Sequence, residues 1–247
     1  MAFNPTAPLS YSAALSKSSN PAAANANNPS SHPPNLPSNN TQPRPPRPRS
    51  RSPTYTPQTH TTDETLYTLT LLTSPPLQTP LTALRTRYFP RHLNKLPAHL
   101  TLFHALPGSQ LRDNVIPTLQ RVAHHTERFR IATGGVMKMR KGMGIFVSPA
   151  HGGRETQAVR RRLLEVWEEG GWLSEQDRAG GGKPHWTVMN KVDDAGAVER
   201  AQREAEEGFK GAEGWGEGLG LWRYEKGWWV WQRGFAFVGG EIGEGGR

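Results

Sequence analysis

Two short apolar segments of the sequence carry the same triplet, a histidine followed two positions later by a threonine. They are KLPAHLTLFHALPG at 95–108 and KPHWTVMNK at 183–191. Successive side chains of a β-strand point to opposite faces, so His99 shares a face with Thr101, and His185 with Thr187. Two such strands across a cleft would supply two acid/base groups and two hydrogen-bond donors. That combination predicts a phosphate-handling site.

The triplet alone is weak evidence, because it occurs four times in the chain. The copy at 60–62 lies in a proline-rich polar segment, and the copy at 124–126 has helical spacing, where residues i and i+2 do not share a face. The other two copies fit a strand and come just after a proline. Their histidines could be ordinary residues at the edge of a core, but the matched prolines and the apolar alternation favour a functional pair.

The quartets HLTL and HWTV resemble the paired signature of the 2H phosphoesterase superfamily, which includes the 2′-5′ RNA ligase and cyclic phosphodiesterase proteins. The longer run YFPRHLNKLPAHLTLFHALPG at 88–108 is similar to the first-motif region of the 2′-5′ RNA ligase-like members. The resemblance covers residues 62–240 and implies a bilobal, duplicated α+β fold, with two antiparallel sheets facing a central cleft. The offset of 86 residues between His99 and His185 is consistent with such a duplication.

The resemblance also implies roles for the four motif residues. Opening a 2′,3′-cyclic phosphate requires a base for the attacking water and an acid for the departing alkoxide, and histidine suits both roles because its ordinary pKa is about 6.5. His99 and His185 are therefore expected to be catalytic, in an order that the sequence leaves open. Thr101 and Thr187 are expected to bind the phosphate oxygens, and the resemblance implies no metal and no cofactor.

The expected partner is RNA or a nucleotide that carries a cyclic phosphate or a 2′-5′ linkage. The sequence does not separate these substrates, nor hydrolysis from ligation. The alternative function is an RNA-binding module that keeps the same cleft with little or no turnover. We expect a monomer with no membrane partner, in the cytoplasm or the nucleus.

Further candidate substrate contacts are Phe103, Lys138 and Arg140. The two cations would share one face of a strand and could meet substrate phosphate, although a solvated edge strand is the favoured alternative. Five of the eight tryptophans lie between 215 and 231. They could stack nucleobases, but such residues more often belong to a core.

The elements that must position these residues follow from hydrophobic periodicity and turn signals. Strands are predicted at 66–72, 129–136 and 137–147, with a reversal at Lys141–Gly142. A hairpin at 219–238 should turn at Lys226–Gly227. Helices are predicted from Thr79–Pro80 to Tyr88, at 111–122 with Pro117 as a kink or start, at 154–167 with Arg160–Arg162 on its exposed face, and at 198–209.

Composition divides the chain into a tail at 1–62 and a domain at 63–247. Thirteen of the 22 prolines precede residue 62, no acidic residue precedes Asp63, and the tail holds few large apolar groups, so we predict that it is disordered. Five of the nine net positive charges lie in this tail. They could attract RNA phosphates non-specifically, but a solvated extension with no dedicated partner is favoured.

The sequence lacks the motifs that are typical of other classes of site. The absence of cysteine removes disulfides, thiol nucleophiles and cysteine-based zinc sites. The run GGGKPH lacks the Ser or Thr that follows the lysine of a phosphate-binding loop. Asp194 stands where the lysine-centred motif of nucleotide-consuming ligases has glycine, so an ATP-driven ligase is not expected. No apolar run approaches the roughly 18 residues needed to cross a membrane.

Overall fold

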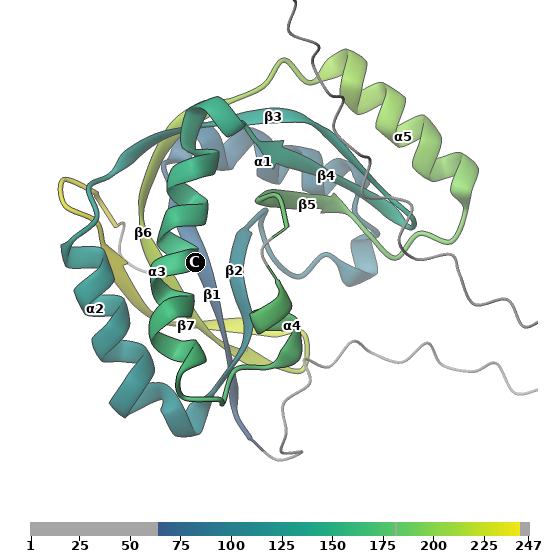
Figure 1. Cartoon of the computed structure of the whole chain (residues 1–247). Helices are drawn as coiled ribbons and strands as arrows, with labels where there is room; N and C mark the ends of the chain where they lie inside the picture. Colours follow the sequence, from purple (N-terminus) through teal and green to yellow (C-terminus); the bar gives the residue numbers. More distant parts are fainter. Residues whose placement is uncertain (1–63, 181, 243–247) are drawn as a thin grey trace, which may run out of the picture. The chain divides into compact units, whose positions relative to one another are not determined.

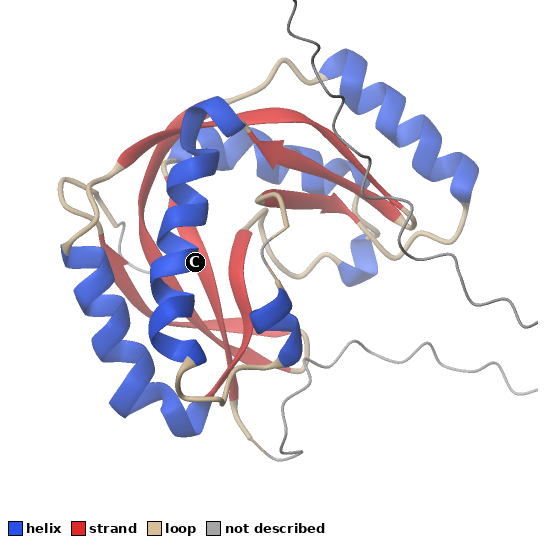
Figure 2. Ribbon diagram, viewed as in Figure 1, coloured by secondary structure: helices blue, strands red, loops and turns tan. Residues whose placement is uncertain are grey.

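The computed structural model describes residues 64–180 and 182–242, and the predicted disordered tail at 1–62 lies outside them. Helices and antiparallel strands are mixed along the chain, which confirms the α+β prediction (Figure 2). The strands are β1 (Leu66–Thr73), β2 (Leu100–Pro107), β3 (Phe129–Met139), β4 (Gly142–Val147), β5 (His185–Met189), β6 (Glu213–Glu225) and β7 (Trp228–Ala236). The α-helices are α1 (Pro75–Tyr88), α2 (Ile116–His124), α3 (Arg154–Glu168), α4 (Glu175–Ala179) and α5 (Ala195–Gly208).

The strands are hydrogen-bonded in the order β2-β1-β6-β3-β4-β5, and β7 pairs with β6. The long strand β3 joins two halves, because residues 129–132 pair with β6 while residues 133–139 pair with β4. Each of the two predicted antiparallel sheets is thus present, and β3 belongs to both. The motif strands β2 and β5 stand at opposite ends of this order, yet they contact each other because the assembly curls round (Figure 1).

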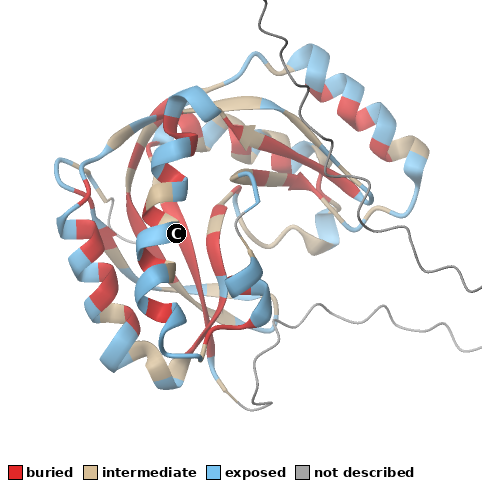
Figure 3. Ribbon diagram, viewed as in Figure 1, coloured by how far each residue is buried: buried red, intermediate tan, exposed pale blue. Residues whose placement is uncertain are grey.

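The helices pack around both halves of the sheet. Helices α2 and α3 pack together, with α2 against β6 and β7, while α1 packs on β5 and β6 and α5 packs on β3 and β4. Buried residues lie on the faces where these layers meet (Figure 3). The core includes Leu69, Phe103, Trp167, Trp186 and Leu219, so it draws on both halves.

Two predicted boundaries are wrong, and prolines and glycines explain both. Helix α1 begins at Pro75 rather than near Pro80. The N–H groups at the first positions of a helix have no partner within the helix, so prolines there cost it no hydrogen bond. Strand β3 continues through Val136 and Met137, where the predicted division fell, and Gly134 and Gly135 lie just before that point. The two glycines mark a register shift between Thr133 and Val136, so the strand bends without ending.

The predicted turn of the last hairpin is confirmed. Lys226 and Gly227 connect β6 and β7 and have φ angles of 48° and 91°. Positive φ at both central residues is typical of the tight turn that matches the twist of paired strands.

Helix α2 begins at Ile116 and has Pro117 in its first turn. Of the two alternatives for Pro117, a kink or a helix start, the structure shows the helix start. Within the described residues no helix is both long enough and apolar enough to span a membrane.

Candidate active site

The two motif histidines have the same side-chain geometry. His99 immediately precedes β2, and its Nδ1 lies 2.8 Å from the carbonyl oxygen of Pro97. His185 begins β5, and its Nδ1 lies 3.0 Å from the carbonyl oxygen of Lys183. Because a carbonyl oxygen only accepts hydrogen bonds, Nδ1 is the donor in both rings. The neutral form of either imidazole therefore keeps its lone pair on Nε2, which can accept a proton.

His99 is held in its neutral form by its surroundings. Burial lowers the pKa of His99 to about 3, and the positive charge of Arg85 acts in the same direction. The ring lies against Trp229, with 4.4 Å between the ring centroids. A neutral imidazole whose Nδ1 is already engaged is suited to act as a base through Nε2.

Arg85 connects the two motif strands. Its Nε donates to Asn94 Oδ1 and to the carbonyl oxygen of Leu96, both at 3.0 Å, just before the first motif. Its Nη1 donates to the carbonyl oxygen of Thr187, in the second motif, at 2.6 Å. Burial lowers the pKa of Arg85 to about 10, so the guanidinium stays charged at neutral pH.

A cavity of about 420 Å³, hereafter the central cavity, lies between β2, α3, α4 and the start of β5. Thr101 and His185 line it together, so the fold brings one residue of each motif into a shared space. His99 and Thr187 are not among its lining residues. The residues that line it are Thr101, Leu102, His104, Thr156, Gln157, Arg160, Arg161, Leu164, Gln176, Asp177, Gly180, Gly182, Lys183, Pro184 and His185.

After Thr101 the side chains of β2 no longer alternate regularly between the two faces of the sheet. Its pairing with β1 shifts register twice, so that Leu69 is opposite Phe103 while Thr70 is opposite Thr101. These bulges turn His104 outward and bury Phe103 completely, against Trp167. Phe103, a candidate substrate contact, is therefore buried in the core and does not line the central cavity, whereas His104 does.

Asp177 fixes this part of β2 from helix α4. Its carboxylate is 1% exposed, and its oxygens accept the backbone N–H groups of His104 and Ala105 at 2.8 and 2.9 Å. His104 Nδ1 lies 3.5 Å from Asp177 Oδ1. Burial alone would raise the pKa of Asp177, but these hydrogen bonds outweigh it and hold the pKa below its usual value. Asp177 is thus an ionised, buried anchor beside the cavity.

Asp177 and His104 were not predicted from the sequence, although a signal for Asp177 was present. Ser174 caps helix α4 by accepting the N–H of Asp177 on its hydroxyl, which is the Ser-x-x-Asp pattern of a helix start. The only signal for His104 was its place five residues after His99 in the first motif segment. Its direction depends on the bulges, which no local pattern reveals.

Positive charge reaches the cavity from α3 and from the segment before β5. Arg160 is half-buried and donates to the carbonyl oxygens of Leu102 and Asp177, at 3.2 and 2.5 Å, so its predicted place on an exposed face is wrong. Arg161 and Lys183 also line the cavity and are exposed. Among residues 64–180 and 182–242, no group of three or more His, Asp or Glu is placed to hold a metal ion.

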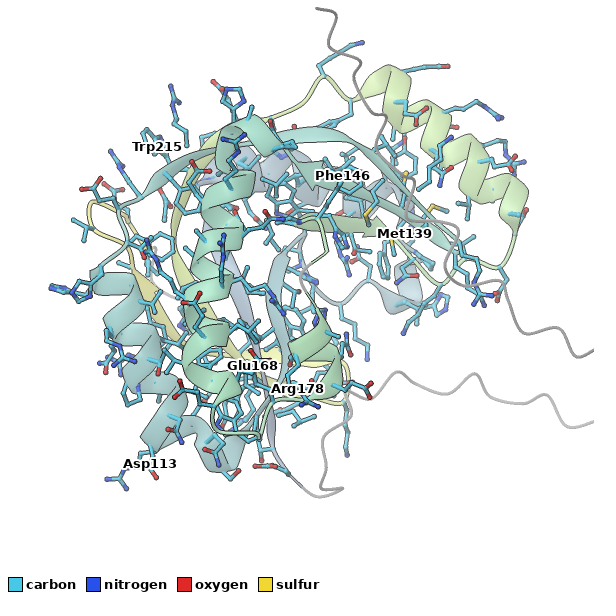
Figure 4. The ribbon with its side chains drawn as sticks, in the orientation of Figure 1. Asp113, Met139, Phe146, Glu168, Arg178 and Trp215 are labelled. Carbon is cyan, nitrogen blue, oxygen red and sulfur yellow. The ribbon has the colours of Figure 1, made fainter. Side chains whose placement is uncertain are left out.

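The other two candidate contacts lie elsewhere. Lys138 and Arg140 are exposed near the tip of the β3–β4 hairpin, where Figure 4 labels the neighbouring Met139. Neither lines the central cavity. At this tip Lys141 pairs with Asp193, and Arg140 contributes to the lowered pKa of that carboxylate. Because β3 continues to Met139, Lys138 and Arg140 lie at the hairpin tip and outside the lining of the central cavity.

The tryptophans of the last hairpin do not join the core, contrary to the expectation. Trp222, Trp229 and Trp231 are half-buried, and Trp228 is 55% exposed. The ring of Trp222 lies 6.3 Å from that of Trp229 and 4.8 Å from that of Trp231. Since Trp229 also touches His99, this group forms an aromatic margin on the His99 side of the site.

Comparison with known proteins places the chain in a family. The profile of the 2′-5′ RNA ligase superfamily matches residues 73–228, which is more than half of the chain and includes both motifs. No curated protein matches the sequence.

Three solved structures are similar to the chain. They are TT0787 of Thermus thermophilus (18% identity, 70% of this chain and 97% of that one, TM-score 0.48), apo LigT of E. coli (10%, 71% and 99%, 0.49) and a protein described as a phosphoesterase (11%, 71% and 99%, 0.49). On the match to the superfamily profile, the chain belongs to the 2′-5′ RNA ligase superfamily, among the 2H phosphoesterases that its two His-x-Thr motifs resemble.

Proposed function

We propose that the protein is a phosphoesterase that acts on RNA ends or nucleotides and opens 2′,3′-cyclic phosphates by acid/base catalysis with His99 and His185. The observation that carries the proposal is the matched geometry of the two imidazoles. Each donates Nδ1–H to a backbone carbonyl two residues upstream, which leaves each Nε2 free for proton transfer. Family membership supports the same class of chemistry.

His99 is assigned the role of base and His185 the role of acid. The lowered pKa of His99 keeps its imidazole neutral, and because Nδ1 donates to Pro97, Nε2 carries the lone pair that can take a proton from the attacking water. Water then bonds to phosphorus as the bond to the opposite ring oxygen breaks. His185 gives its Nε2 proton to that oxygen, which leaves as a hydroxyl. Proton exchange with solvent restores both imidazoles, so no other reactant is consumed.

The remaining groups are proposed to stabilise charge on the phosphoryl oxygens. Thr101 and Thr187 would donate hydrogen bonds from their hydroxyls, one from each motif strand. Arg161 and Lys183 on the cavity wall would attract the anionic substrate into the central cavity. Run in reverse, the same proton transfers would join a hydroxyl to a cyclic phosphate, so ligation and cleavage share one site.

The test is turnover of 2′,3′-cyclic mononucleotides and of a short RNA with a 2′,3′-cyclic end by the full-length protein. The reaction is run in EDTA, and the products are identified by phosphorus NMR. We expect one regioisomer of the monophosphate, because an acid fixed on β5 protonates one ring oxygen only. Equal amounts of the 2′ and 3′ products would contradict a positioned acid. RNA binding without turnover would instead favour the binding-module function.

A further inference from the structure

A second pocket, hereafter the side pocket, adjoins the central cavity. It has a volume of about 240 Å³ and lies between β3, β4 and the start of α3. Gln157, Lys183 and Pro184 line both spaces, so a ligand in one can extend directly into the other. No motif residue lines the side pocket, and the proposed chemistry gives it no role.

The register of β4 and β5 places the aromatic ring of this pocket beside the catalytic acid. Phe146 is the direct partner of His185 in the antiparallel ladder, and Gly144 is the partner of Thr187. Opposed residues share a face of the sheet, with Cβ atoms about 4.5–5.5 Å apart. Phe146, which Figure 4 labels on β4, therefore projects from the same face as His185.

The glycines around this pair keep the face open. A Cβ on Gly144 would lie 3.2 Å from Cδ2 of His185 and would crowd the imidazole. A Cβ on Gly134 would lie 3.4 Å from Cβ of Phe146, whereas one on Gly135 would meet no atom within 4 Å. With no side chains at 134 and 135, the part of the pocket wall that these two residues form is backbone.

The chemistry of the side pocket suits a planar, uncharged ring with polar edges. Phe146 is half-buried, and Lys183 Nζ lies 5.4 Å from its ring centroid, at the border with the central cavity. The exposed side chains of Arg154 and Gln157 stand at the pocket and offer donors, and the Gln157 amide also offers an acceptor. Proteins that bind unpaired nucleotides use the same combination of a stacking aromatic ring and polar groups on the base edge.

We propose that the side pocket binds the nucleobase of the nucleotide whose phosphate lies at His185, with Phe146 stacking on the base. This inference rests on the proposed function for the position of the phosphate. Lys183, shared by the two spaces, lies where the phosphate and the base connect through the ribose. The substrate is accordingly a nucleotide or an RNA end, recognised through its base as well as its phosphate.

The test measures binding, so that it does not depend on turnover. Adenosine 3′-monophosphate and ribose 3-phosphate are titrated into the full-length protein by calorimetry. We expect the nucleotide to bind more tightly than the sugar phosphate. Phe146→Leu should weaken binding of the nucleotide by about 5- to 150-fold, the usual worth of one stacked base, and should leave the sugar phosphate unaffected.

Two further variants control for packing. Phe146→Tyr keeps the aromatic face and should bind the nucleotide like the original protein. Trp215→Leu removes a half-buried ring that Figure 4 shows well away from Phe146, and it should change neither affinity. Thermal melts check that each variant is folded, and the comparison of the two ligands on the unaltered protein stands even if Phe146→Leu does not fold.

The outcomes separate this inference from the proposed function. Equal affinities for the nucleotide and the sugar phosphate, or no effect of Phe146→Leu, would overturn the side pocket as a base site and leave the phosphoesterase intact. Base-dependent binding without turnover of any cyclic phosphate would support the side pocket and overturn the catalytic proposal. Binding of neither ligand at millimolar concentration would overturn both.

Discussion

Arg85 on helix α1 donates a hydrogen bond to the backbone carbonyl oxygen of Thr187, the threonine of the second motif, at 2.6 Å. The two residues lie 102 positions apart in the sequence. The same guanidinium binds the segment before the first motif, so one buried cation sets the spacing of the two motif strands. It also adds to the low pKa of His99.

Replacing Arg85 by lysine should destabilise the protein. An ammonium cannot reach three acceptors from one position, and each acceptor left unpaired in the interior costs about 1–3 kcal/mol. Urea unfolding measures the loss. Arg87→Lys, on the same helix, is the matched control, because its pair with Glu204 is exposed and is worth at most about 1 kcal/mol. Equal effects of the two substitutions would contradict the role given to Arg85.

The low pKa of His99 predicts a pH dependence of stability. Between about pH 6.5, where an unfolded histidine titrates, and pH 3, the unfolded chain binds a proton at this position that the folded protein does not bind. The free energy of unfolding should therefore fall as the pH is lowered through this window. His99→Asn removes the titration and keeps an N–H near the Nδ1 position, so its melting temperature should fall less between pH 7 and pH 4. Parallel curves for the two proteins would contradict a His99 that stays neutral in the folded protein.

Asp177→Asn should loosen the bulged part of β2. An amide offers one acceptor oxygen where the carboxylate offers two, so one of the buried N–H groups of His104 and Ala105 loses its partner, at about 1–3 kcal/mol. Turnover should fall as well, because Thr101 and His104 lie on the same stretch of strand. Glu175→Gln on the same helix is exposed and should change the stability by less than about 0.5 kcal/mol. Similar urea midpoints for the two variants would count against Asp177 as an anchor.

The threonine hydroxyls can be tested separately from the threonine shape. Thr101→Val and Thr187→Val keep the branched side chain and remove the donor, so turnover should fall by about 10²- to 10³-fold. Thr101→Ser and Thr187→Ser restore the hydroxyl and should recover most of that loss in a steady-state assay. If the valine variants match the serine variants, the hydroxyls do not stabilise the phosphoryl oxygens.

The sequence predicted the motif strands well because their alternation is local. His99 and Thr101 occupy partly exposed positions while Leu100 and Leu102 are buried, and β5 repeats the pattern with His185 and Thr187. Beyond Thr101 the alternation does not continue, and Phe103 is buried in the core. The bulges of β2 arise from its pairing with β1. The backbone N–H groups of His104 and Ala105 also donate hydrogen bonds to Asp177, which lies 72–73 positions away in the sequence.

The parts of the site that were missed share a physical cause. Helix α4 is a single short turn, so it has no hydrophobic periodicity to read. Arg85 and Arg160 look like ordinary charged positions of amphipathic helices, yet both are drawn inward by backbone carbonyl groups that lie far away in sequence. Burial of a charge with paired acceptors depends on the assembled fold, which local patterns do not encode.

The central claim is that the imidazoles of His99 and His185 perform the acid/base chemistry. The most direct test is the turnover number of His99→Asn and His185→Asn on a 2′,3′-cyclic nucleotide, with circular dichroism to confirm folding. Each single variant should lose about 10²- to 10⁴-fold, and the double variant should lose little more than the worse single one, because acid and base act in one step. Near-normal turnover in either folded single variant would contradict the account.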